Sequence, residues 1–327
     1  MRLFVRFAIL GLGSVAPLRA QGSCAPGALA EAAKTVAAVR HSLHGQSVGE
    51  SDPVVPAAVA QQLMQLKDSL ALAAEAAFAC APVTSTPDAL QSTLSAALHA
   101  NVASAAEQAV VDVKARRDIG AYGSDLAVQV FQLFGKPKFY EVDFRYGIEC
   151  GDDNLLLVYE AAGDTDGAWR KRLRWDAPTY RTVGDAIGDF VMLTPLTGND
   201  QHPSWRFVVA HGQPACGKLP RPSQFDLDLL SPASDGSRPT VDWHFEHAYT
   251  NGTNTVPRLA TTEDTIDVQL TSAPEIPGKK PAKPPTVESY RFHLTADGRI
   301  EPSPASAESE GPAGTTVSKP STASSPQ

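Results

Sequence analysis

The stretch VQVFQLFGKPKFYEVDFRY, residues 128–146, marks the point at which the chain changes from one type of secondary structure to another. Apolar side chains alternate with polar ones on both sides of Gly135-Lys136-Pro137, at Val128, Val130, Tyr140, Val142, Phe144 and Tyr146. This alternation is typical of strands with one buried face, and Gly and Pro favour the turn between them, so the stretch predicts a β-hairpin. Taken alone, Val128–Phe131 could instead extend a preceding helix, and the sequence leaves that alternative open.

The chain after this hairpin continues as a series of short strands. Further alternating or apolar runs lie at Leu155–Tyr159, Trp169–Trp175, Phe190–Leu193, Trp205–Ala210, Phe225–Leu230, Val241–Tyr249, Ile266–Leu270 and Tyr290–Leu294. Turn residues separate these runs and no helical spacer lies between them, which favours antiparallel pairing. We therefore expect an all-antiparallel β domain over residues 122–301, built as a sandwich or a strongly curved sheet, with a barrel left open.

The chain before the hairpin is helical in pattern, from Pro26 to about Arg117. Apolar residues spaced three and four apart form two narrow seams, at Leu29, Ala32, Val36, Val39 and Leu43 and at Val59, Leu63, Leu66, Leu70, Ala73 and Ala77. Gly45, Gly49 and Pro53 separate the seams, so we expect two amphipathic helices folded back as an antiparallel hairpin.

A third helix follows the helical hairpin. Thr86 can act as its N-cap and Pro87 suits the first helical position. Its apolar face would run through Leu90, Leu94, Leu98, Val102, Ala105 and Ala109. The fold class is thus α+β, with a helical domain over residues 24–117 that precedes the β domain.

The two ends of the chain have compositions unlike the rest. Arg2 and Arg6 precede an apolar run over residues 7–15, and Leu18-Arg19-Ala20 ends in a small residue, as in a secretory signal peptide over residues 1–20. Residues 302–327 are rich in Ser, Thr, Pro, Gly and Ala, which predicts a disordered tail. Ala273–Pro285 contains five prolines and predicts an extended loop. We expect an exported protein, periplasmic or extracellular, without a membrane span.

The overall charge argues against nucleic acid as a partner. The chain has 28 Lys and Arg residues against 36 Asp and Glu residues, for a formal net charge of −8. Cleavage of a leader that contains Arg2, Arg6 and Arg19 would make the mature chain more acidic still. Such a surface repels nucleic acid and anionic membranes.

Four cysteines behind an export signal predict disulfides. Cys24 precedes the first helix and Cys80 ends the second, so an antiparallel hairpin brings both to the same end. The sequence thus predicts a Cys24–Cys80 bridge, and a Cys150–Cys216 bridge between neighbouring strand ends, although four cysteines permit three pairings. Cys24 could in principle carry a lipid, but the residues before it lack the aliphatic side chain of a lipidation signal, so we expect no lipid anchor.

One strand has an unusual charge pattern. In Trp169-Arg-Lys-Arg-Leu-Arg-Trp175, alternation places Arg170, Arg172 and Arg174 on one face, with Trp169, Leu173 and Trp175 on the other. Acidic residues occupy the polar faces of neighbouring strands, at Glu141, Asp143, Asp226, Asp228, Asp242 and Glu246. These charges are typical of a solvated outer face with cross-strand ion pairs. The alternative is an arginine row that binds an anionic polymer or a partner's carboxylates.

Histidines and acids show no spacing typical of a metal site. His244 and His247 are three residues apart in one predicted strand and so lie on opposite faces. His202, His211 and His293 have no ligand-like spacing to them. The acids of Gly151-Asp152-Asp153-Asn154 and Asp164-Thr-Asp166-Gly167 are typical of turns. We therefore expect no metal site and no cofactor.

The functional hypotheses follow from these patterns. The leading one is a non-catalytic binding or accessory protein of the cell envelope, whose partner is an envelope protein or an anionic polymer. The alternative is a hydrolase that acts on cell-wall or polysaccharide material through dispersed Asp, Glu and His residues. A third hypothesis is a helical hairpin that docks to an envelope partner, which an exposed apolar seam on the hairpin would favour.

Overall fold

The computed structural model describes thirteen segments and one isolated residue of the chain. These are residues 24–44, 46, 56–102, 122–133, 138–148, 151–161, 168–177, 191–196, 206–213, 223–233, 238–249, 253–262, 264–274 and 286–303. Within these segments, no helix has both the length and the apolar character needed to cross a membrane.

Three helices form the N-terminal part, as the seams predict. They are α1 (Ala28–Leu43), α2 (Ala57–Cys80) and α3 (Pro87–Leu98). The Oγ1 atom of Thr86 accepts a hydrogen bond from the backbone N–H of Ala89 at 3.2 Å, and Pro87 occupies the first turn, so the predicted cap is confirmed.

The third helix is shorter than the sequence predicts. It ends at Leu98, because His99 adopts the left-handed conformation with φ of 50° and the chain then turns. Asn101–Val102 forms the short strand β1 instead of a further helical turn. The expected extension of the apolar face to Val102 is therefore wrong, while Ala105 and Ala109 lie outside the described residues.

The strands form three sheets. The first has the order β1 to β5, with β2 (Ser124–Leu133), β3 (Phe139–Ile148), β4 (Gly151–Ala161) and β5 (Trp169–Asp176). The second contains β6 (Val191–Leu196), β7 (Arg206–Gln213), β8 (Ser223–Ser231) and β9 (Thr240–Tyr249). The third contains β10 (Thr253–Thr261), β11 (Thr265–Pro274), β12 (Thr286–Leu294) and β13 (Ile300–Ser303).

Pairing between neighbours is antiparallel except at β1, which runs parallel to β2. Val128–Phe131 belongs to β2, so the strand interpretation of this segment is confirmed over the helical one. The sequence did not predict β10 or β13. β10 contains Pro257, which has no N–H to donate to a ladder and weakens a strand pattern.

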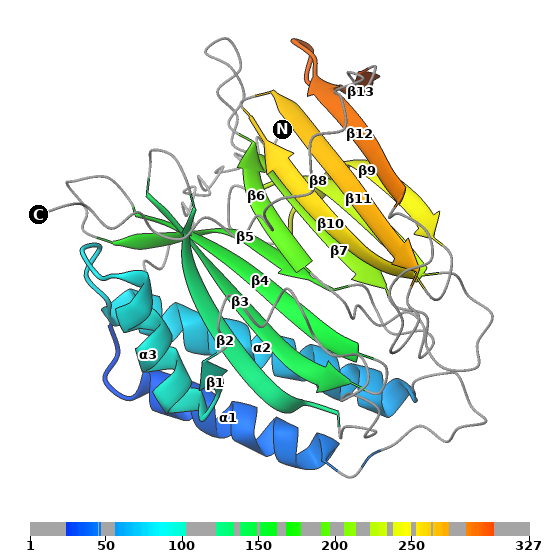
Figure 1. Cartoon of the computed structure of the whole chain (residues 1–327). Coiled ribbons are helices and arrows are strands. Elements are labelled where there is room, and N and C mark those ends of the chain that lie inside the picture. Colours follow the sequence, from blue (N-terminus) through cyan, green and yellow to red (C-terminus); the bar gives the residue numbers. More distant parts are fainter. Residues whose placement is uncertain are drawn as a thin grey trace, which may run out of the picture.

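The helices cover one face of the first sheet (Figure 1). Leu63, Leu66 and Leu70 of α2 are fully buried in one cluster with apolar side chains from β2, β3 and β4, among them Val128, Val142, Phe144, Leu155 and Leu157. The chain's own sheet therefore covers the apolar seam of α2. The hypothesis of a docking hairpin needs an exposed seam, and this one is buried.

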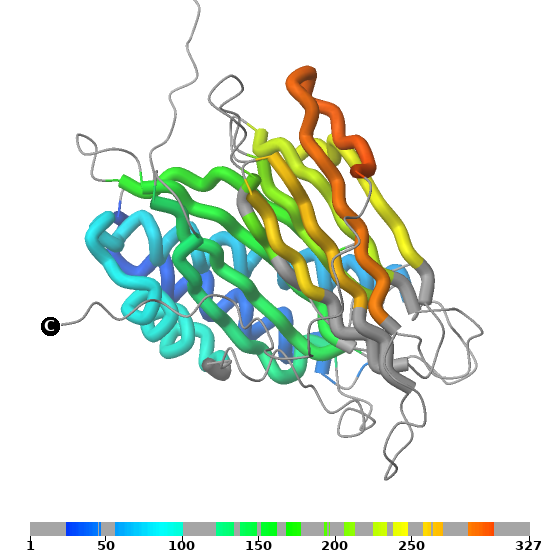
Figure 2. Tube along the Cα trace, turned by 45° about the horizontal axis from the view of Figure 1, so that its top comes forward, coloured from blue at the N-terminus to red at the C-terminus, as the bar shows by residue number. Residues whose placement is uncertain are grey.

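The second and third sheets pack face to face, with the third in front of the second (Figure 2). Their shared core contains Val208 and Leu227 from one sheet and Val268 and Phe292 from the other. A further cluster joins the far face of the first sheet to the second sheet, through Leu156 and Phe207. The structure is thus an α+β fold in which a sheet sandwich adjoins a helix-covered sheet.

Several predictions concern residues outside the described segments. These are the leader over residues 1–20, most of the loop 273–285, the tail beyond Ser303, and both Cys150 and Cys216. The division into a helical domain over residues 24–117 and a β domain over 122–301 stays a prediction. Side chains of α2 and of the first sheet belong to one core cluster, so substitutions in that cluster can test whether the two parts unfold separately.

Candidate functional site

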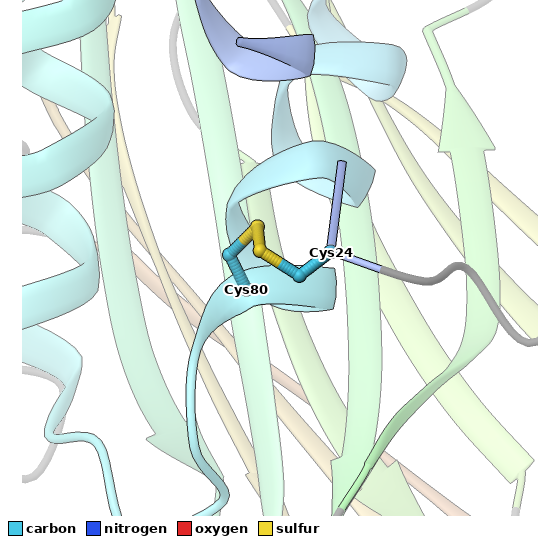
Figure 3. Close-up of a disulfide and its surroundings, with 2 residues drawn as sticks. All are labelled: Cys24 and Cys80. Atoms are coloured by element: carbon cyan, nitrogen blue, oxygen red, sulfur yellow. A yellow bond between two sulfur atoms is a disulfide. The ribbon is translucent and has the colours of Figure 1, made fainter. Parts of the chain in front are cut away.

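A disulfide closes the helical hairpin at its open end, as predicted (Figure 3). Cys24 lies just before α1 and Cys80 is the last residue of α2, and their Cα atoms are 4.6 Å apart. The Cys24 sulfur is therefore bonded to the Cys80 sulfur. The absence of a lipid anchor stays a prediction. Disulfides form and persist in oxidising compartments. Export stays a prediction.

The three arginines of β5 do not form one row, because a β-bulge interrupts the alternation. Leu173 pairs with Val158 and Lys171 pairs with the next residue, Tyr159, so Arg172 has no partner opposite it on β4. A bulge of this type shifts the faces of all residues on one side of it. The predicted shared face of Arg170, Arg172 and Arg174 is therefore wrong.

Each side of the bulge has its own partners. Arg174 Nη2 contacts Asp68 Oδ1 of α2 at 2.6 Å and Asp176 Oδ1 at 3.1 Å, on the helix side of the sheet. Arg172 pairs with Glu160 of the neighbouring strand, and Arg170 is exposed. An anionic ligand at Arg172 or Arg174 would have to displace these carboxylates, which costs free energy. A binding role for the three arginines stays a prediction.

The tryptophans on the same strand follow the same division. Trp169 lies on the helix side, with its ring centroid 5.3 Å from that of Phe78 and 4.8 Å from that of Tyr140. Trp175 lies on the opposite side, in the cluster shared with the second sheet. Both rings pack against core clusters, but on opposite faces of the sheet, so the predicted shared face of Trp169 and Trp175 is also wrong.

Several acids predicted on solvated faces are instead buried. Glu141, Asp143 and Asp226 have exposed fractions of 1%, 4% and 2%. Alternation does place Glu141 and Asp143 opposite the helices. That side of the sheet is covered rather than solvated, because the second sheet packs against it through Leu156 and Phe207. The interpretation of a solvated polar face is therefore wrong for these acids.

A second buried polar group links α2 to the first sheet. Lys67, Asp153 and Tyr146, which we call the buried triad, are almost fully enclosed. Lys67 Nζ lies 2.9 Å from Asp153 Oδ1 and donates a hydrogen bond to the backbone carbonyl of Ala177 at 3.1 Å. The Tyr146 hydroxyl donates to Asp153 Oδ2, and the backbone N–H of Asn154 donates to Asp153 Oδ1 at 2.9 Å.

The surroundings of the buried triad shift its acid–base properties. Burial raises the pKa of Asp153, although Lys67 and the hydrogen bonds from Tyr146 and Asn154 oppose that rise. Burial and the neighbouring carboxylate together raise the pKa of Tyr146 well above its usual value. Perturbed groups of this kind can mark active sites. This triad is closed to solvent, so it fits a structural role in fixing α2 on the sheet.

The most chemically capable group lies on the second sheet. His211 of β7, Asp226 and Asp228 of β8, and His244 and Glu246 of β9 form what we call the histidine–carboxylate cluster. Register explains why they meet: Asp226 lies opposite both His211 and Glu246, and Asp228 lies opposite His244. Residues two apart on a strand share a face, so the five side chains share one face of the sheet.

The distances within this cluster are short. Asp228 lies between the two histidines, 2.7 Å from His244 Nδ1 and 3.2 Å from His211 Nε2. Asp226 also faces both, 3.6 Å from His244 Nε2 and 3.8 Å from His211 Nδ1. The ligand atoms of Asp226, His244 and Glu246 all lie within 4.8 Å of one another.

The cluster spans the boundary between core and solvent. His211 has an exposed fraction of 3%, and the ring of Trp175 from the first sheet lies 5.2 Å from its ring, whereas Glu246 is exposed. Burial raises the pKa of Asp228, but hydrogen bonds and charge from His211 and His244 outweigh burial and leave that pKa below its usual value. Asp228 is thus an ionised acceptor for both rings.

Sequence reasoning did not find this cluster. The pairs Asp226-x-Asp228 and His244-x-Glu246 each place two ionisable side chains on one face of a strand, and this spacing can be seen in the sequence. The pairing register that sets β7, β8 and β9 side by side was not visible. His244 and His247 do lie on opposite faces, as predicted, since His247 Nε2 lies 3.2 Å from Glu288 of the third sheet.

A further surface feature follows one edge of the sandwich. Within the described segments, β9 pairs with β8 alone and forms an edge of the second sheet. Its Trp243 and Phe245 are half-buried, with their rings against those of Phe292 and Tyr290 of β12. We call these four residues the aromatic ladder. Val241, at the start of β9, is 53% exposed.

No model of a known protein family matches this chain, and no curated protein is significantly similar to it in sequence. Its function is therefore inferred from the geometry of the described residues.

Proposed function

We propose that this chain is an exported, non-catalytic binding or accessory protein of the cell envelope, located in the periplasm or outside the cell. Its partner in this proposal is an envelope protein that contributes an extended segment to the edge strand β9. The observation that supports the proposal most directly is the combination of an edge strand with the half-buried aromatic ladder beside it.

The chemistry of an edge strand explains this choice of partner. An edge strand has backbone N–H and C=O groups directed away from its own sheet, and an added strand can pair with them. Specificity then comes from alternate side chains of the added strand. Trp243 and Phe245 would receive the apolar ones, because aromatic rings contribute large contact areas at interfaces.

The partner can be tested by site-specific photo-cross-linking in intact cells. A photoreactive residue replaces Val241 on β9, and a matched control replaces Leu72 of α2, which is exposed to a similar degree at 57%. We expect an adduct from position 241 that maps to one extended segment of an envelope protein, and no such adduct from position 72. Equal adducts from both positions, or none from position 241, would contradict the proposal.

Export can be tested separately through the disulfide. We expect the full-length chain to form the Cys24–Cys80 bridge in cells, and a variant that begins at residue 21 to remain reduced in the cytosol. Electrophoresis without reductant after alkylation of free thiols distinguishes the two forms. If the leaderless variant is oxidised to the same extent, the bridge carries no information about the compartment.

The histidine–carboxylate cluster favours a second candidate, a hydrolase that acts on cell-wall or polysaccharide material. Asp226 is buried and Glu246 is exposed, so two neighbouring carboxyl groups have unlike environments, a pattern found in acid–base pairs. Release of soluble products from purified cell-wall material by the wild type, with loss of that release in Glu246→Gln, would favour this candidate over the binding protein.

A further inference from the structure

We propose that the histidine–carboxylate cluster is a binding site for one divalent transition-metal ion, with Asp226, His244 and Glu246 as its ligands. This inference is independent of the proposed partner, because it concerns the face of β9 opposite the aromatic ladder. Its starting point is the geometry: the three ligand atoms already lie within 4.8 Å of one another on two adjacent strands.

The tautomer of His244 is the first supporting step. A carboxylate can only accept a hydrogen bond, so the 2.7 Å contact to Asp228 places the proton of a neutral His244 on Nδ1. The lone pair then lies on Nε2, which is the atom 3.6 Å from Asp226 Oδ1. Two ligand atoms of a tetrahedral zinc ion, each about 2.1 Å from the metal, lie about 3.4 Å apart. The observed separation is close to that value.

Asp228 lies where metal sites commonly have a supporting carboxylate, next to the ring nitrogen of the histidine that does not bind the metal. Such a carboxylate accepts the proton of the non-ligating ring nitrogen, fixes the orientation of the ring and raises its basicity. Asp228 does this for His244 through Oδ1 and for His211 through Oδ2, at 2.7 and 3.2 Å. It is therefore a positioning residue rather than a ligand in this proposal.

His211 gives an independent indication that a cation belongs here. It is 3% exposed, and by the same reasoning its lone pair lies on Nδ1, which makes no hydrogen bond within the described part of the chain. That nitrogen faces Asp226 Oδ2 at 3.8 Å. A buried lone pair directed at a carboxylate is unfavourable unless positive charge lies nearby. A metal ion on Asp226 supplies that charge.

The balance of charge points the same way. Asp226 and Glu246 are directly opposite one another on adjacent strands, an arrangement that destabilises a sheet when both carry the same charge. Asp228 adds a third carboxylate on the same face. A divalent ion offsets this repulsion, and the imidazole nitrogen favours zinc and similar transition metals over calcium or magnesium.

The experiment uses zinc alone as the probe. Mature protein stripped with a chelator is titrated with Zn²⁺ by isothermal titration calorimetry, and Co²⁺ is added separately to record the visible absorption of a four-coordinate ion. We expect saturable binding of one ion, at least tenfold weaker in His244→Gln and in Glu246→Gln. Both side chains are exposed, so these variants should fold, as circular dichroism can verify.

The matched control is His247→Gln, which removes a histidine from the same strand but from its opposite face. We expect it to bind zinc as the wild type does. Asp228→Asn should weaken binding by about 10 to 100-fold, as loss of a supporting carboxylate does in known sites. Absence of saturable binding to the wild type would overturn the proposal. Equal binding by wild type, His244→Gln and Glu246→Gln would overturn it as well.

Discussion

Lys67 shows what a fully buried charge requires of its neighbours. Its ammonium group has a carboxylate at 2.9 Å and a backbone carbonyl at 3.1 Å, and Asp153 has further donors in Tyr146 and Asn154. A buried pair of this kind contributes little net stability compared with apolar residues, yet removal of one partner leaves the other charge buried and uncompensated. The triad therefore makes the position of α2 on the sheet specific.

The first prediction concerns the loss of this compensation. Lys67→Met keeps the size and apolar stem of the side chain but removes its charge, so the free energy of unfolding should fall by about 3 to 5 kcal/mol. Urea unfolding followed by circular dichroism measures the change. The double variant Lys67→Met/Asp153→Asn should recover part of the loss, because the orphaned carboxylate is gone. A double variant less stable than Lys67→Met would contradict this account.

The same variant should show a distinctive pH dependence. Burial raises the pKa of Asp153 in the folded state, and Lys67 opposes that rise, so loss of Lys67 should raise this pKa further. A carboxyl with a raised folded-state pKa favours folding when protonated and loses that effect as the pH rises through the folded-state pKa. The penalty of Lys67→Met should therefore grow from acidic to neutral pH. A penalty that is constant over that interval would show that Asp153 is not the group responsible.

The start of α3 offers a prediction about a single structural element. Thr86→Ala removes the side-chain acceptor of the Ala89 N–H, so the free energy of unfolding should fall by about 0.5 to 2 kcal/mol. Thr93→Ala is a matched control within the same helix, because Thr93 bonds only to the carbonyl of Ala89 among the described contacts and alanine is a better helix former. It should leave stability unchanged or slightly higher. Equal losses in the two variants would contradict a capping role.

The elements that the sequence predicted well are those with a regular period. The seams of α1 and α2 and the alternation in β3 follow from local spacing, and both are present as predicted. β5 shows where such reasoning stops. Its alternation is regular in sequence, but the bulge at Arg172 depends on how β4 pairs with it, and that register is set by packing on both faces. The histidine–carboxylate cluster was missed for the same reason.

The arrangement of the layers gives polar residues unequal environments. The first sheet is covered by helices on one face and by the second sheet over part of the other, so polar residues such as Glu141 become buried where alternation alone predicts solvent. β9 is at an edge of the sandwich and remains accessible. This contrast explains why the edge strand and the histidine–carboxylate cluster, on which the two proposals rest, both lie in the second sheet rather than on the arginine-bearing strand.

The disulfide allows a test of cooperativity across these layers. Cys24 and Cys80 are 56 residues apart in sequence, for which the chain-entropy estimate of stabilisation is about 4 kcal/mol as an upper figure. From the sequence alone, Cys24→Ser should loosen residues 26–80 and leave the sheets intact. The core that α1 and α2 share with β2, β3 and β4 changes that expectation, because loosened helices expose the inner face of the first sheet.

We therefore expect hydrogen exchange on Cys24→Ser to show faster exchange in α1, α2 and the inner strands β2 to β4, while β11 and β12 keep their protection. The double variant Cys24→Ser/Cys80→Ser should behave alike, which excludes an effect of the free Cys80 thiol. Faster exchange confined to residues 26–80 would instead support the predicted domain division. The core that contains β11 and β12 is separate from the helix-covered core, so loss of the bridge should not reach these two strands directly. Faster exchange in β11 and β12 would therefore show that all three sheets unfold as one cooperative unit.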